Sequence, residues 1–344
     1  MPGLEISFLG IEFPNPFLLA SGPPSASGAM VVEAFKAGWG GAALKTISLD
    51  PTRPPSPRVH VIRSGKLKWG MLDIELFSDM TVEQWEGEID RIRDAFPDRP
   101  IIASVSGTNT PASWQDLVGR IEPHGVNAFE MNTSCPNFSE GVERGSKLGQ
   151  DPEALGLAVS WVRQVTRLPL IVKLTPNVAD LRPLVRAALE AGADGFCATN
   201  SLSGIGGIDL DDFAPLPSVD GIGMVGGYGG TGLRPVALRC TADIVQTSPA
   251  PVFGCGGISK WRDAVEYLAA GASAVQVCTA VMLDGLQIIQ RLTRGLDEYL
   301  QSRGLNSVTA IIGKGLPDGT REGLLRLYGQ TGRPDDRYEP SKLR

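Results

Sequence analysis

The sequence predicts an α/β fold of the (β/α)8 TIM-barrel type. Eight short apolar segments alternate with eight segments of helical periodicity along the 344 residues. Several helical segments end in Ala-Gly, and polar side chains gather just after the apolar segments. Eight such units in a chain of this length are typical of the barrel. The alternative is a doubly wound open sheet, but no G-x-G-x-x-G follows the first strand, and Gly22-Pro23-Pro24 is too stiff for that role.

The strand candidates are short and rich in apolar or β-branched residues. Such runs are expected of parallel strands that are buried on both faces. They are residues 17–21, 41–46, 101–106, 128–132, 170–175, 195–200, 252–256 and 274–278.

The helix candidates have apolar positions at three- and four-residue spacing, which predicts one buried stripe per helix. Glycines after Ala37, Ala191 and Ala270 indicate C-caps, because glycine tolerates positive φ. The candidates are residues 28–37, 82–96, 111–121, 152–166, 181–191, 234–246, 261–269 and 286–301.

Additions to a minimal barrel are expected at both ends. Residues 4–13, with Gly10 at a turn, predict an N-terminal β-hairpin that plugs the barrel bottom. Long irregular loops are expected after strands 2, 4 and 6, at residues 47–80, 133–150 and 202–233. All follow strand C-termini, so they should form lids or binding loops on the catalytic face.

The predicted domain division is a barrel over residues 1–301 and a polar C-terminal tail over residues 302–344. The tail is rich in Gly and Pro, and one short helix is expected near residues 321–328.

Composition excludes several functional classes. The net charge is −6 with no basic cluster, which argues against a nucleic-acid partner. The apolar runs are too short to span a membrane, and no signal-peptide pattern is seen, so we expect a cytoplasmic protein. The five cysteines form no C-x-x-C pair and there are two histidines, so no metal site is predicted.

Two lysines close apolar strands. A buried lysine is rare without a partner, so Lys45 and Lys173 predict a pocket for an anionic or electron-rich guest. A phosphate group would suit one of these lysines, and the edge of a flavin ring that becomes negative on reduction would suit the other. The alternative is that each side chain reaches solvent.

Small and polar residues follow other strands. Gly256-Gly257 and Cys278-Thr279 come after strands 7 and 8, where such barrels cradle phosphate, and Gly230 offers another close-approach loop. The side chains of Asn132 and of the segment Thr199-Asn200-Ser201 can donate and accept hydrogen bonds, which suits a planar heterocycle with N–H and C=O groups. Ordinary turn glycines and turn-capping asparagines are the alternatives.

The thiol of Cys135 follows the fourth strand, where it would face a ligand and could act as a general acid. Cys197, Cys240 and Cys255 are interpreted as packing residues.

These motifs resemble the flavin mononucleotide (FMN) domain of dihydropyrimidine dehydrogenase, in the superfamily that includes the dihydroorotate dehydrogenases. The resemblance spans about residues 5–300 in order. It is carried by Leu44-Lys45-Thr46, Asn132-Thr133-Ser134-Cys135-Pro136, Lys173-Leu174-Thr175-Pro176-Asn177, Ala198-Thr199-Asn200-Ser201, Gly230-Thr231-Gly232-Leu233-Arg234-Pro235 and Val275-Gln276-Val277-Cys278.

The resemblance implies an FMN-dependent oxidoreductase of pyrimidine metabolism. It would interconvert a pyrimidine-like heterocycle and its dihydro form, with hydride passing through flavin N5 and a proton through Cys135. It implies a flavin site made of Ala20, Ser21, Lys45, Thr46, Asn132, Lys173, Thr199, Gly230, Gly256, Gly257, Cys278 and Thr279. The substrate would meet Asp73, Glu75, Asn132, Ser134, Asn200 and Ser201.

Three departures from the family pattern bear on specificity and partners. Asp73 stands where the dihydropyrimidine enzymes carry Asn, which disfavours the carboxylate of orotate unless Asp73 is protonated or pairs with Lys45 or Lys68. The loop after Cys135 carries Asn137-Phe138 in place of a His-Gly type pair. No cysteine-rich segment or nicotinamide fingerprint is present, so electrons would come from a separate subunit, a carrier or direct contact with the flavin.

Two other functions are kept as alternatives. One is a dihydroorotate dehydrogenase with the same fold and cofactor. The other is an electron-relay or docking subunit of a larger complex of the dihydropyrimidine dehydrogenase type. By family analogy a homodimer is expected.

Overall fold

Eight parallel strands hydrogen-bond into a closed barrel in the order β10-β17-β18-β3-β4-β7-β8-β9. The computed structural model describes residues 3–53, 55–56, 58–133 and 148–316. Each barrel strand falls within one of the eight predicted segments, so the predicted fold class is confirmed. The strands are β3 (Phe17–Leu19), β4 (Gly41–Ala43), β7 (Ile101–Val105), β8 (Ala128–Asn132), β9 (Leu170–Leu174), β10 (Gly195–Ala198), β17 (Val252–Cys255) and β18 (Ala274–Val277).

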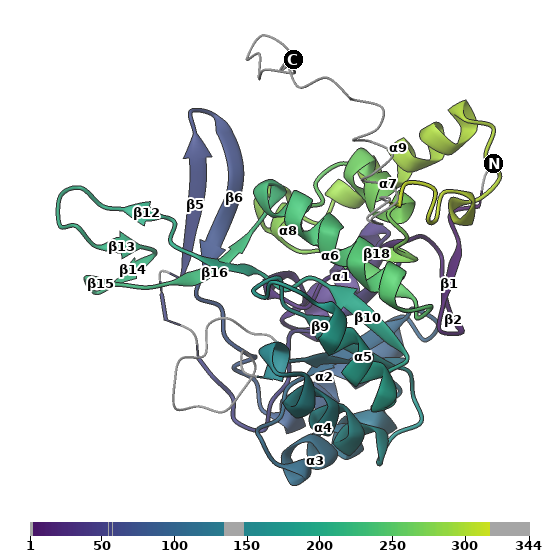
Figure 1. Ribbon diagram of the computed structural model, residues 1–344, viewed down its shortest axis with the longest axis horizontal. Coiled ribbons are helices and arrows are strands. Elements are labelled where there is room, and N and C mark those ends of the chain that lie inside the picture. The colour runs from purple at the N-terminus through teal and green to yellow at the C-terminus, as the bar shows by residue number, and fades with distance from the viewer. Residues whose placement is uncertain (1–2, 54, 57, 134–147, 317–344) are drawn as a thin grey trace, which may run out of the picture.

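Eight of the helices follow the predicted segments and lie around the barrel (Figure 1). Ser27 starts the first of them by accepting a hydrogen bond from Met30 N, and Gly38 ends it at φ 114°. The helices are α1 (Gly28–Ala37), α2 (Val82–Ala95), α3 (Pro111–Ile121), α4 (Pro152–Arg163), α5 (Arg182–Glu190), α6 (Arg234–Thr247), α7 (Trp261–Ala269) and α9 (Ile288–Ser302).

One further α-helix, α8 (Thr279–Asp284), follows the last barrel strand and was not predicted. Its six residues are too few to show helical periodicity. Short 3-10 helices complete the connections. They are η1 (Pro23–Ser25), η2 (Glu122–His124), η3 (Leu148–Gln150), η4 (Thr231–Leu233) and η5 (Val308–Ala310).

The predicted N-terminal hairpin is present and closes the bottom of the barrel. Strands β1 (Ile6–Phe8) and β2 (Ile11–Phe13) pair antiparallel. The ring of Phe8 stacks on Phe253 of β17 with centroids 3.7 Å apart. The ring of Phe13 lies so close to Gly41, at the start of β4, that a Cβ there would meet it at 2.8 Å. The hairpin therefore seals the N-terminal end with aromatic rings.

The segments after the second and sixth barrel strands differ from the irregular loops that we predicted. Strands β5 (Val59–Ser64), β6 (Leu67–Asp73), β11 (Leu202–Gly204) and β16 (Gly226–Gly229) form one antiparallel sheet in the order β11-β16-β6-β5. Two segments far apart in sequence complete each other's hydrogen bonds, which local patterns cannot reveal. The remaining strands form two short pairs within an arm that projects from the barrel (Figure 1): β12 (Gly207–Ile208) with β13 (Pro215–Leu216), and β14 (Ser218–Val219) with β15 (Ile222–Gly223).

Most of the predicted loop at 133–150 lies outside the described residues, as does the helix predicted near 321–328. The start of the predicted tail packs on the barrel: Ser307 bridges to Gly3, and Gly315 N donates to Ala269 O at 2.8 Å. Within the described ranges, no helix has both the length and the apolar character needed to cross a bilayer.

The hairpin plug gives a stability prediction. Phe8→Ala removes a fully buried, stacked ring and should lower the free energy of unfolding by about 3–5 kcal/mol. Phe213→Ala is the control, because that ring is 74% exposed and its loss should change stability by less than about 0.5 kcal/mol. Urea unfolding followed by tryptophan fluorescence measures both; equal midpoints for the two variants would contradict a plug role.

Candidate active site

Many polar side chains face a cavity at the carboxyl ends of the barrel strands. The cavity encloses about 940 Å³, open solvent at its mouth included. The predicted site residues found in its wall are Ala20, Ser21, Lys45, Thr46, Asp73, Glu75, Asn132, Lys173, Thr199, Asn200, Ser201, Gly230, Gly256, Gly257, Cys278 and Thr279. Two further predicted residues, Ser134 and Cys135, lie outside the described residues.

A buried charge network occupies the floor of the cavity. Lys173 Nζ lies 3.2 Å from Glu130 Oε1 and 3.4 Å from Gln276 Oε1. Gln276 Nε2 donates to the other oxygen of Glu130 at 2.7 Å. These three side chains come from β9, β8 and β18, so barrel closure brings them together. Lys173 therefore has an internal counterion, where we had predicted that it awaited an anionic guest.

Two opposing effects set the charge state of Lys173. Burial is the largest single effect and would lower the pKa of its ammonium group, but the attraction of the nearby acidic groups, Glu130 first among them, outweighs burial in sum and the pKa is raised. Lys173 thus stays protonated across the neutral range and presents a fixed positive charge at the cavity floor.

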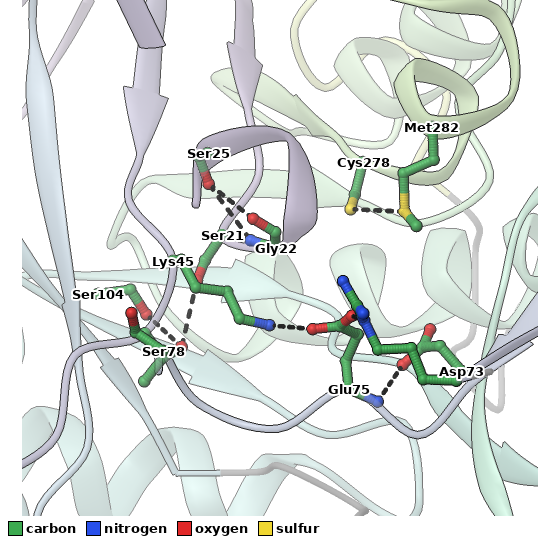
Figure 2. A network of polar contacts seen from close by, with 12 residues as sticks. Ser21, Gly22, Ser25, Lys45, Asp73, Glu75, Ser78, Ser104, Cys278 and Met282 are labelled. Atoms are coloured by element: carbon green, nitrogen blue, oxygen red, sulfur yellow. Dashed lines mark hydrogen bonds and ion pairs between the residues drawn. The ribbon is translucent and has the colours of Figure 1, made fainter. Parts of the chain in front are cut away.

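A second ion-pair network lies at the rim. Lys45 Nζ contacts Glu75 Oε2 at 2.5 Å, and Arg58 Nε pairs with the other oxygen of Glu75. The backbone N–H of Glu75 donates to Asp73 Oδ1 at 3.2 Å. Figure 2 shows Lys45 and Glu75 pointing toward each other, with Asp73 beside Glu75. Lys45, like Lys173, therefore forms an ion pair with a carboxylate of the protein itself.

Hydroxyl and amide groups connect the strand ends between these networks. Thr46 Oγ1 lies 3.2 Å from Ser21 Oγ and 3.0 Å from Ser104 Oγ, and it accepts from Asn132 Nδ2 at 2.9 Å. Asn200 Nδ2 in turn donates to Asn132 Oδ1 at 3.2 Å. The chain of contacts fixes the orientation of both amides, as a site for a planar ring requires.

A glycine cradle forms the opposite wall. Gly230 and Gly257 have positive φ values of 109° and 73°. A Cβ on Gly257 would meet Gly230 O at 2.7 Å and Arg234 N at 2.9 Å. The two loops therefore touch through backbone atoms, and neither glycine can be replaced without a shift.

One polar atom in this wall has no partner in the described part of the chain. The hydroxyl of Thr199 is buried without a hydrogen bond there, although Thr199 lines the cavity. A buried hydroxyl of this kind is costly unless a ligand completes it.

The thiols are divided between cavity and core. Burial, with a smaller effect of Asp73, raises the pKa of Cys278 to about 12, so this cavity thiol stays protonated. Cys197 and Cys240 are buried, as expected for packing residues. Cys255 is also buried but lines the cavity, because it is the last residue of β17.

Three functional residues were missed by the sequence analysis. Glu130 and Gln276 lie inside strands. Glu130 could have been found from the sequence, because a charged residue within the apolar run Ala128–Asn132 is unusual. Arg58 lies in an irregular segment before β5, where the sequence offers no signal.

The closed parallel barrel, with a cavity lined by polar side chains at the carboxyl ends of its strands, is the architecture of an α/β-barrel enzyme. The family described as dihydroorotate dehydrogenase matches residues 3–300, and the chain belongs to this family. It is thus an oxidoreductase that acts on CH–CH bonds.

Relatives within the family carry two kinds of name. The chain is 34% identical over 315 residues to the NAD-dependent dihydropyrimidine dehydrogenase subunit PreA of Escherichia coli K12, covering 90% of this chain and 76% of the relative. It is 32% identical over 329 residues to the chloroplastic dihydropyrimidine dehydrogenase (NADP(+)) of Arabidopsis thaliana, covering 92% and 77%. It is 38% identical over 313 residues to the catalytic subunit of dihydroorotate dehydrogenase B (NAD(+)) of Pyrococcus horikoshii, covering 91% and 98%.

The floor network gives a pH-dependent prediction. Glu130→Gln removes the carboxylate that lies 3.2 Å from the buried ammonium group of Lys173 and should lower the free energy of unfolding by about 3–5 kcal/mol at neutral pH. In the variant, burial should bring the pKa of Lys173 below the unfolded value of about 10.4. The folded variant then binds fewer protons than the unfolded chain, so its stability should rise with pH toward that value.

The wild-type protein should show no such rise, because its raised Lys173 pKa keeps this contribution intact until above about pH 10.4. Urea midpoints near neutral pH and at about pH 9.5 measure the effect. Glu33→Gln is the control, since its pair with Lys36 is 2.8 Å long but has side chains 62% and 59% exposed, and should contribute less than about 1 kcal/mol. A destabilisation of the Glu130 variant that is constant with pH would contradict the assignment.

Proposed function

We propose that this protein is an FMN-dependent oxidoreductase that interconverts a pyrimidine-like heterocycle and its dihydro form. The observation that carries the proposal is the convergence of the two lysines, the paired amides and the glycine cradle on one cavity. The names of the relatives, dihydropyrimidine dehydrogenase and dihydroorotate dehydrogenase, support this substrate class. The proposal places the reaction in pyrimidine metabolism.

The residues present fit FMN. The backbone cradle of Gly230, Gly256 and Gly257 with Thr279 offers close approach for a phosphate, and the unpartnered Thr199 hydroxyl faces the same cavity. Ala20, Ser21, Lys45, Thr46, Asn132, Lys173 and Cys278 would line the ring system. When bound, FMN supplies a site at N5 that accepts or donates hydride. The permanent charge of Lys173 would stabilise negative charge at the ring edge.

The chain's own residues would orient the substrate and handle the proton. Asn132 and Asn200 are held by their mutual hydrogen bond, so the orientation of both amide groups at the cavity wall is preset. Asp73, Glu75, Ser134 and Ser201 complete the proposed substrate set. Cys135 is proposed as the acid–base group from its sequence position, because the ordinary thiol pKa of about 8.5 permits proton transfer near neutral pH.

Electrons are proposed to reach the flavin from a separate electron-transfer subunit or carrier. Two of the relatives are named as subunits, PreA and the catalytic subunit of dihydroorotate dehydrogenase B, which supports this arrangement. A homodimer of this chain is proposed by analogy.

A dihydroorotate dehydrogenase is the second candidate. The observation that favours it is the 38% identity to the Pyrococcus horikoshii catalytic subunit, of which the chain covers 98%. The two candidates share fold and cofactor and differ in the ring substituent that the rim of the cavity must accept.

The proposal is tested on purified protein. Its visible spectrum should show bound flavin, and released cofactor should be identified as FMN by mass. At least one compound of a panel of dihydrouracil, dihydroorotate and related dihydro-heterocycles should then bleach the flavin under anaerobic conditions. A colourless protein that takes up no FMN, or a flavin that none of these compounds bleaches, would refute the proposal.

Loss of the Cys135 thiol should affect turnover without affecting cofactor binding. Cys135→Ala should slow substrate-dependent bleaching by about 10²–10⁴-fold, the usual contribution of a positioned acid–base group. Stopped-flow spectroscopy of the FMN-loaded variant measures this step. Cys240→Ala removes a thiol buried in α6, outside the cavity, and should leave the bleaching rate unchanged. Full activity of the Cys135 variant would remove this residue from the mechanism.

The glycine cradle predicts a loss of FMN affinity in one glycine variant. Gly257→Ala forces a Cβ against Gly230 O and Arg234 N at a φ of 73°, so we expect FMN affinity to fall at least about tenfold, or about 1.4 kcal/mol. Gly87→Ala is the matched control, because Gly87 lies in α2 with no atom within 4 Å of the added Cβ. Fluorescence titration of flavin-free protein with FMN compares the two; equal affinities would argue against the cradle.

A further inference from the structure

The projecting arm, residues 205–225, carries most of its large apolar side chains on its surface. Its strands are two residues long and pair only within the arm, β12 with β13 and β14 with β15. Of these residues, all of which the structure describes, only Ala214 and Pro217 are buried. Leu210 is 79% exposed and Ile222 is 68% exposed. Short two-stranded pairs have little stability of their own, and exposed apolar surface of this kind is typical of a segment that a partner covers.

The charged side chains of this arm are all acidic. The arm contains no Lys or Arg, and its acids are Asp209, Asp211, Asp212 and Asp220. Asp211, Asp212 and Asp220 are exposed, and none of them forms an ion pair with another described residue. The arm therefore presents negative charge without a counterion in the described chain, beside exposed apolar side chains.

The β5–β6 hairpin carries the opposite charge. Residues 59–72 contain Arg63, Lys66 and Lys68 but no acidic residue. All three side chains are exposed, and they too form no ion pair within the ranges that the structure describes. Trp69, next to Lys68, is 51% exposed. The hairpin thus combines positive charge with apolar surface, as the arm combines negative charge with apolar surface.

The ends of the arm and of the hairpin do not meet within one chain. Near their bases they touch, since a Cβ on Gly206 would meet His60 Cδ2 at 2.8 Å. From there they project in different directions, and their ends lie well apart (Figure 1). In a dimer with a twofold axis, each pair of contacting surfaces occurs twice. The arm of each copy can therefore lie on the hairpin of the other.

We propose that the arm and the β5–β6 hairpin form the interface of a homodimer, in which the acidic arm of each copy packs on the basic hairpin of the other. The occupant is a second copy of this chain, because the chain itself carries both halves of a surface that is complementary in charge. The dimer proposed above by analogy has no surface assigned to it, and this inference supplies one. It does not depend on the proposed enzymatic function.

Sedimentation velocity of the full-length protein tests the oligomeric state. The wild-type protein should sediment as a dimer at micromolar concentration. Its dissociation constant should rise as salt is added, because salt screens contacts between exposed charges. A wild-type protein that remains monomeric would overturn the proposal and leave the arm to a different partner. A dimer whose affinity is unaffected by salt would also overturn it.

Charge reversal tests each half of the interface. Asp211→Lys with Asp212→Lys makes the arm basic, and Lys66→Glu with Lys68→Glu makes the hairpin acidic. Either double variant brings like charges together in its own homodimer, so each should raise the dissociation constant at least about a hundredfold. A dimer that persists unchanged in both double variants would refute the assigned surfaces.

Asp94→Lys with Asp116→Lys is the matched control. It makes the same change in net charge as the arm variant, at exposed residues of α2 and α3, and should leave the dissociation constant unchanged. An equal loss of affinity in this control would show that net charge and not the arm governs association.

An equimolar mixture of the two double variants separates charge pairing from misfolding. In the mixed dimer, the basic arm of one variant meets the acidic hairpin of the other, and the acidic arm meets the basic hairpin. The mixture should therefore dimerise with an affinity within about tenfold of the wild type. Asp211→Lys and Lys66→Glu, used singly, replace a double variant that folds poorly. Two folded variants that stay monomeric when mixed would contradict the pairing of arm and hairpin.

Discussion

Closure of the parallel barrel is the constraint on which the site depends. Each strand contributes three to five residues to the ladder, and side chains that finish neighbouring strands must meet at one rim. The register fixes which residues meet: Asn132 lies opposite Lys173, and Cys255 lies opposite Gln276. The aromatic hairpin closes the other end, so only the carboxyl rim is open to a ligand.

In the part of the chain that the structure describes, each lysine of the cavity wall has a carboxylate partner. Lys173 is matched by Glu130 at the floor, and Lys45 is matched by Glu75 at the rim. At the floor, such pairing holds an ammonium group whose pKa burial alone would lower. The two pairs serve different ends. The floor pair keeps a cation permanently in place, whereas the rim pair gives Lys45 a counterion within the protein.

The sequence was sufficient for the barrel, because each strand and helix carries its own apolar pattern. Gly38, for instance, ends α1 where the Ala-Gly step predicts a C-cap. The convergence of the predicted site residues also follows from their position at strand ends. Glu130 and Gln276 could not be assigned from local pattern, since their partnership depends on closure across the barrel. The same holds for the sheet of β6 and β16, whose strands are separated by more than a hundred residues.

The sheet that contains β6 and β16 connects Asp73 at the rim of the cavity with the glycine cradle. Strand β16 pairs with β6 so that Gly227 lies opposite Asp73 and Gly229 lies opposite Met71. Gly230 of the cradle follows directly, and the hydroxyl of Thr231 donates to Trp69 O at 2.9 Å. A Cβ on Gly230 would meet Gly70 Cα at 2.4 Å, so the cradle rests on the strand that carries Asp73. The barrel itself supplies the cavity floor, whereas the inserted sheet positions the carboxylate at the rim. The side chains at the rim can therefore change with the inserted segments while the lysine network and the strand register stay the same.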